Sequence, residues 1–168
     1  MNILARLNHQ IPMPRLQSTG TGATIGRHSL VSNASMPYHF EFDSISRILR
    51  CRFVGRITDE DLKGYYRLIE RYDAQIAPHG GILDMSGVTA FDVSPQTIRE
   101  LASLPPAMAD ASRPRCIVAT SPEIFGMARM FELHGENTRP HLHVVRTQNE
   151  ALAILAVREP KFEPIELK

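Results

Sequence analysis

Residues 82–95 read Ile-Leu-Asp-Met-Ser-Gly-Val-Thr-Ala-Phe-Asp-Val-Ser-Pro, and this stretch decides the fold. Its apolar start, Ile82–Met85, predicts a short buried strand that leads into a turn at Ser86-Gly87. Ser94 and Pro95 predict the start of a helix, because serine caps free backbone N–H groups and proline suits the first helical position. A strand followed by such a helix start is typical of a sheet with helical crossovers.

Upstream of this stretch the sequence predicts an antiparallel hairpin and a long helix. Tyr38, Phe40 and Phe42 alternate with polar residues, and a turn at residues 43–46 separates them from a second strand at residues 48–56. Thr58 is the expected cap of the helix, whose buried stripe recurs every three or four residues. That stripe consists of Leu62, Tyr65, Tyr66, Ile69, Tyr72 and Ile76.

Downstream, strands and helices alternate to the end of the predicted domain. The predicted order is β-β-α-β-α-β-α-β-α, which indicates an α/β fold with a mostly parallel sheet, an antiparallel N-terminal edge strand and helices on its faces. The later strands are expected at residues 116–119 and 142–145, and the later helices start at Ser94, Ser121 and Thr147. Thr147 and Glu150 have the spacing of a capping box.

Composition excludes several classes of function. The 168 residues suit one domain, and 43% apolar with 22% charged content is ordinary for a globular protein. A net charge of +1 gives no reason to expect nucleic acid as a partner. The apolar runs are too short for a transmembrane segment, so we expect a cytoplasmic protein. Cys51 and Cys116 lie in predicted strands as small hydrophobic residues.

Residues 1–35 differ from the rest, because they contain three arginines and no acidic residue. An organelle transit peptide, a disordered extension and a start codon assigned too early, with Met36 as the true start, all account for this composition. The glycines of residues 20–26 have no strand before them and no amphipathic helix after them, so they indicate a linker rather than a nucleotide loop. We expect a leader at 1–35, a domain at 36–158 and a C-terminal tail at 159–168.

The order of elements and three stretches resemble the STAS domain of bacterial anti-sigma-factor antagonists, in its SpoIIAA-like branch. The stretches are residues 82–95, residues 116–131 with the runs Cys-Ile-Val-Ala-Thr-Ser and Ile-Phe-Gly-Met-Ala-Arg-Met-Phe, and residues 150–155 with the run Glu-Ala-Leu-Ala-Ile-Leu. The resemblance covers about residues 36–158. It implies a bacterial signalling protein of an uncharacterised group, with protein binding or lipid binding as its function.

The resemblance also singles out Asp92 and Ser94. In phosphorylated STAS domains a partner kinase modifies a serine at the start of the helix, within an Asp-Ser-Ser-Gly pattern. Asp92 and Ser94 match that pattern, while Val93 and Pro95 depart from it. The residues themselves indicate a helix cap at Ser94, where aspartate would cap equally well. The two interpretations, a plain cap and a site of phosphorylation or partner binding, both remain open.

Two other groups of residues suggest chemistry less strongly. Asp84 and Ser86 lie at the end of a central strand, but no histidine is placed to complete a hydrolase triad, and Asp84 is expected to cap a turn around Gly87. His141 and His143 share one face of an expected edge strand, without a carboxylate or thiol to complete a metal site. We therefore expect no catalytic residues, no metal and no cofactor.

The helix at residues 123–135 carries more apolar residues than one buried stripe needs. Ile124, Met127, Ala128 and Phe131 form that stripe, whereas Met130 and Leu133 fall on the opposite side. Methionine-rich apolar surface adapts to partners, so Met127, Met130 and Leu133 are candidates for a partner or ligand surface. Alternatively, the loop at 107–114 or the C-terminal tail packs there.

These observations predict a non-enzymatic regulatory module that binds a protein through the helix start at residues 92–99. A homodimer is also expected, and the Met130 and Leu133 side of the helix at 123–135 is the candidate for a dimer contact. The alternative is a carrier of a lipid or other apolar small ligand, held in a pocket between the sheet and the helices.

Overall fold

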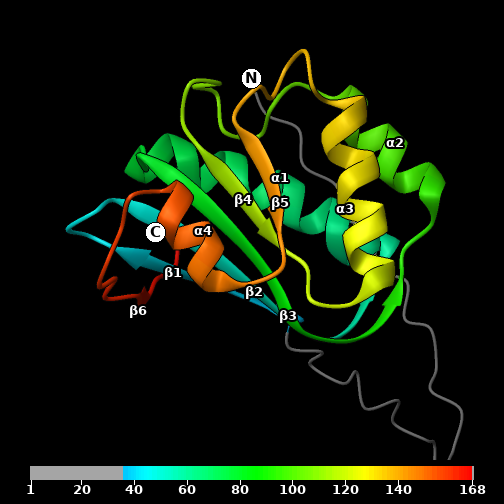
Figure 1. Ribbon diagram of the computed structural model, residues 1–168, viewed down its shortest axis with the longest axis horizontal. Helices are drawn as coiled ribbons and strands as arrows, with labels where there is room; N and C mark the ends of the chain where they lie inside the picture. The colour runs from blue at the N-terminus through cyan, green and yellow to red at the C-terminus, as the bar shows by residue number, and fades with distance from the viewer. Residues whose placement is uncertain (1–35, 168) are drawn as a thin grey trace, which may run out of the picture. The chain divides into compact units, whose positions relative to one another are not determined.

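The computed structural model describes residues 36–167, which form one sheet with helices on both faces (Figure 1). The strands are β1 (Tyr38–Asp43), β2 (Ile48–Thr58), β3 (Gly80–Asp92), β4 (Arg115–Val118), β5 (Leu142–Val145) and β6 (Glu163–Pro164). The helices are α1 (Asp59–Ile76), α2 (Pro95–Ser103), α3 (Pro122–His134) and α4 (Gln148–Ile154).

The sheet has the order β5-β4-β3-β2-β1-β6. Strands β2 to β5 are parallel to one another, and β1 runs antiparallel to both β2 and β6. The predicted α/β class, with a mostly parallel sheet and an antiparallel N-terminal strand, is confirmed. None of the helices in residues 36–167 combines the length and the apolar character needed to cross a bilayer.

Alternate residues of the central strands pack on opposite faces of the sheet. On β4, Cys116 packs against the α4 side together with Ala151, while Ile117 packs against the α3 side together with Ile124. The largest cluster joins β1 and β2 to α1 and α2 around Phe53, which is fully buried. Figure 1 shows α4 in front of the sheet and α1 behind it, so α1, α2 and α3 share the face opposite α4.

The helix starts agree with the sequence predictions, because each cap is a local interaction. The hydroxyls of Thr58, Ser94, Ser121 and Thr147 each accept a hydrogen bond from the backbone N–H three residues later. Such caps satisfy N–H groups that have no partner inside the helix.

Strand β3 is much longer than predicted, since it continues from Met85 to Asp92. The turn expected around Gly87 is wrong: Gly87 pairs with Val54, and the ladder to β2 continues past two register shifts. Gly55, which lies at the second shift, has a φ of +79°, a conformation that suits glycine.

The C-terminal segment was expected as a tail, yet part of it joins the sheet. Glu163 and Pro164 pair with β1 as β6, and the Ile165 N–H donates to the Phe40 carbonyl at 3.0 Å. Ile165 and Leu167 pack against the largest cluster. The expectations for residues 1–35 lie outside the described residues.

Candidate functional site

The start of α2 is joined to the start of α1 through Ser94. The Ser94 hydroxyl accepts from the Thr97 N–H at 3.2 Å, which makes Ser94 the cap of α2. Both the N–H and the hydroxyl of Ser94 donate to Oδ1 of Asp59, at 2.8 and 3.3 Å. Asp59 is the first residue of α1. One carboxylate oxygen therefore links the two helix starts.

The Asp59 carboxylate is stabilised in its charged form. Its pKa is lowered, first because it accepts the Ser94 backbone N–H and further because of side-chain bonds from Thr97 and Ser94. The Asp92 carboxylate makes no hydrogen bond to Ser94 and pairs with Arg56 at 2.5 Å. We call the residues around this junction the α2-start surface. Its members are half-buried Ser94 and the exposed residues Asp92, Pro95, Gln96 and Arg99.

The structure separates the three candidate residues of α3. Met127 is half-buried and lines a cavity, whereas Leu133 is 60% exposed. The placement of Met130 opposite the buried side is wrong, since Met130 is half-buried and packs against the largest cluster. The reason is that α2 packs against α3 and supplies Ile98 to that cluster. Only Leu133 remains as a large exposed apolar side chain on α3.

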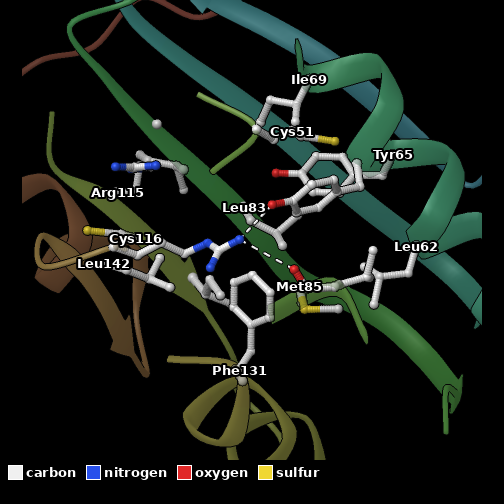
Figure 2. A pocket seen from close by; sticks show the side chains of 18 of the residues that line it. Cys51, Leu62, Tyr65, Ile69, Leu83, Met85, Arg115, Cys116, Phe131 and Leu142 are labelled. Atoms are coloured by element: carbon white, nitrogen blue, oxygen red, sulfur yellow. Dashed lines mark hydrogen bonds between the residues drawn. The ribbon is translucent and has the colours of Figure 1, made fainter. Parts of the chain in front are cut away.

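A cavity of about 110 Å³ lies between the sheet and helices α1, α2 and α3. Figure 2 shows Leu83 and Met85 on the β3 side of the cavity, with Tyr65 reaching toward them from α1 and Phe131 from α3. Most of its wall is apolar. The remaining wall residues include Cys51, Leu62, Tyr66, Ile69, Met108, Arg115, Met127, Arg139 and Leu142.

The polar part of the wall is centred on Arg139, which is 4% exposed. Its guanidinium donates to the carbonyls of Ala102 and Leu104 at 2.9 and 2.7 Å, in and just beyond the last turn of α2. It also donates to the Tyr66 hydroxyl at 2.7 Å, and Tyr66 in turn donates to the Pro105 carbonyl at 2.5 Å. Arg139 thus satisfies carbonyls at the end of α2 that have no partner within that helix.

Arg115 is a second buried cation in the wall, at 9% exposed. Its hydrogen bonds go to the backbone carbonyls of Met108, Asp110, Ala111 and Arg113, at 3.2 to 3.5 Å. The pKa of Arg115 is lowered, first by burial and second by the positive charge of Arg139. The cavity therefore has an apolar wall with a positive field on one side.

Comparisons with known proteins find matches among solved structures alone. No family model matches the chain, and no curated protein sequence is similar to it. Among solved structures, the chain is similar to SpoIIAA. That structure is of the Bacillus cell fate determinant SpoIIAA in its phosphorylated form, with 15% identity and a TM-score of 0.45. The match covers 69% of this chain and 96% of SpoIIAA. The fold class rests on the sheet and helices described above.

The other groups that the sequence brought forward are not assembled into a site. Oδ1 of Asp84 accepts the Ser86 N–H at 3.0 Å, a bond within β3. His141 precedes β5, which is an edge strand as predicted, and His143 is half-buried on it. Among residues 36–167, no three His, Cys, Asp or Glu side chains gather as metal ligands.

Both cysteines are free thiols, and burial raises their pKa values, that of Cys116 to about 12. Thiolates, the reactive form, are therefore scarce at neutral pH.

The residues that the sequence did not single out are Arg139, Arg115 and the hydroxyl of Tyr66. Tyr65 and Tyr66 were interpreted only as part of the buried stripe of α1. Arg139 lies between α3 and β5, where an arginine carries no local signal. A buried arginine is recognised only from tertiary contacts, in this case with the end of α2.

Proposed function

We propose that this chain is a non-enzymatic regulatory module that binds a protein partner through the α2-start surface. The observation that supports this proposal is the link between Ser94 and Asp59. A half-buried serine hydroxyl lies at the junction of two helix starts, so a change at this one side chain alters both helices and the surrounding surface.

Phosphorylation of Ser94 illustrates such a change. A phosphate adds about 1.5 to 2 negative charges at neutral pH. The Ser94 hydroxyl would lose its proton and with it the bond to Asp59, and the phosphate would be repelled by the carboxylates of Asp59 and Asp92. The N-terminus of α2 favours negative charge, so the helix itself tolerates the group. The expected result is a folded domain with a changed α2-start surface.

The experiment is a quantitative pulldown with the wild type and three variants. Arg99→Glu changes the charge of the α2-start surface without touching a cap, and Ser94→Asp changes the junction itself. Ser121→Asp is the matched control, because Ser121 caps α3 and also precedes a proline. We expect one protein to be recovered with the wild type and the control, and to be lost with the other two. Equal recovery with all four proteins would refute the proposal.

A second candidate function is the binding of a small ligand with an apolar body, and the cavity against Met127 favours it. At about 110 Å³ the cavity is smaller than the roughly 300 to 1,000 Å³ of sites for drug-sized ligands. We therefore propose a ligand of only a few non-hydrogen atoms in this cavity, rather than a complete lipid.

A further inference from the structure

The charge of Arg139 in the cavity wall has no carboxylate partner among residues 36–167, whereas the charges of Asp73 and Asp110 act on Arg115. Arg139 and Arg115 are both buried, and neither forms an ion pair with a carboxylate among residues 36–167. All hydrogen bonds of the two guanidinium groups go to carbonyls and hydroxyls. Buried charges in proteins are usually paired, because burial removes their hydration. The Arg139 guanidinium carbon lies over the Phe131 ring, 4.9 Å from the ring centroid, and this contact is only a weak partner for the charge.

Two donors on this wall have capacity left for a ligand. The terminal nitrogens of Arg139 are occupied, but its Nε–H makes no hydrogen bond to residues 36–167. The Tyr65 hydroxyl also makes none, although Tyr65 is only 9% exposed. Among residues 36–167, every side-chain nitrogen or oxygen that is fully enclosed by protein has a hydrogen-bond partner. Arg139 Nε and the Tyr65 hydroxyl have no such partner, so neither atom is fully enclosed. Both residues line the cavity.

Tyr65 can act as a donor at any physiological pH. Burial raises its pKa well above the ordinary value for tyrosine, so the hydroxyl keeps its proton. Figure 2 shows the Tyr65 side chain directed from α1 toward Leu83, another residue that lines the cavity.

We propose that the cavity binds a small aliphatic carboxylate, with its negative group held by Arg139 and the Tyr65 hydroxyl and its apolar body against Leu83 and Met85. This inference rests on the second candidate function and names the class of ligand. A carboxylate accepts hydrogen bonds from both donors and balances the charge of Arg139. A phosphate fits less well, because its oxygens surround it and some would face the apolar wall.

The volume sets the size of the ligand. An apolar cavity of about 150 Å³ accepts benzene, which has six carbon atoms. A cavity of about 110 Å³ accordingly takes about four to six non-hydrogen atoms. Butyrate, with six, is at the upper end of this range and is the probe for the test.

The experiment titrates the full chain with sodium butyrate and with butyramide, its neutral counterpart of equal size, at constant ionic strength. We expect saturable one-to-one binding by calorimetry, with butyrate bound at least about tenfold more tightly, because hydrogen bonds to a charged acceptor are the stronger ones. Tyr65→Phe keeps the ring and removes the donor, so butyrate affinity should fall about tenfold. Leu83→Phe fills the cavity and should abolish binding of both compounds.

The outcomes separate this inference from the candidate function on which it rests. Equal affinity for butyrate and butyramide would overturn the carboxylate and leave a cavity that binds neutral ligands. No saturable binding of either compound would overturn both. If Tyr65→Phe, checked for folding by circular dichroism, binds butyrate as well as the wild type does, the assigned donor is wrong and the inference fails.

Discussion

Replacement of Ser94 by aspartate tests how the two helix starts are joined. By the capping rule alone, aspartate serves as well as serine, so Ser94→Asp should be nearly neutral. The structure contradicts that expectation, because the Ser94 hydroxyl also lies 3.3 Å from the carboxylate of Asp59. A carboxylate at position 94 would replace a hydrogen bond with a repulsion between like charges.

The magnitude follows from two terms. Ser94→Ala removes the bond from the Thr97 N–H and keeps the backbone bond to Asp59, so it should cost about 1 kcal/mol of the free energy of unfolding. Ser94→Asp keeps the cap but places two negative charges about 4 Å apart, which costs about 1 kcal/mol in water and more with less screening. Since this junction lies at the surface, we take about 1 kcal/mol for the aspartate variant too.

The assay is urea unfolding at pH 7 and low salt. Ser121→Asp provides the control, because Ser121 caps α3 with a bond from Ile124 at 3.2 Å and donates to no carboxylate among residues 36–167. It should lie within about 0.5 kcal/mol of the wild type. Asp59→Asn should restore most of the loss in Ser94→Asp. A Ser94→Asp variant as stable as the wild type, or one that Asp59→Asn does not rescue, would refute this account.

Four further predictions concern other parts of the chain. Met130→Ser should lower the free energy of unfolding by about 1 to 2 kcal/mol, because Met130 packs against the core. Leu133→Ser should change it by no more than about 0.5 kcal/mol, because Leu133 is exposed. Equal losses for the two variants in denaturant unfolding would contradict this packing. Removing residues 159–168 should cost about 2 kcal/mol, measured in the same way, since β6 and three half-buried apolar residues (Phe162, Ile165 and Leu167) are lost. No change in stability would show that this segment contributes nothing. The lowered pKa of Asp59 contributes stability above about pH 4, and this stability is lost as pH falls through the pKa of Asp59 in the folded protein. Asp59→Asn should therefore make the free energy of unfolding depend less on pH in that range. An unaltered pH dependence would argue against the hydrogen bond between Ser94 and Asp59. Deleting residues 1–35 should leave the melting temperature within a few degrees, and a large fall would refute the predicted leader.

The starts of the helices could be predicted because their signals are local. Thr58, Ser94, Ser121 and Thr147 each place a capping hydroxyl three residues before the N–H that it accepts, within a single turn of chain. The strand at Leu142–Val145 was also predicted at its observed bounds, since it is a short apolar run between polar neighbours.

The parts that could not be predicted depend on distant residues. The second half of β3 lacks alternation, and only its register with β2 makes it a strand. The position of Met130 depended on α2 covering α3, which no helical wheel contains. Likewise, the positive wall of the cavity arises because Arg139 contacts Tyr66, which lies 73 positions away.

The pairing of β6 with β1 has a consequence for synthesis of the chain. β1 is the first strand of the described residues to leave the ribosome, and β6 is the last. Among these residues, β6 is the sole strand on the outer edge of β1, so that edge stays unpaired until β6 emerges (Figure 1). Unpaired edges are sites of aggregation for nascent chains. Chains that stall or terminate before β6 should therefore depend on chaperones more than chains that include β6 do.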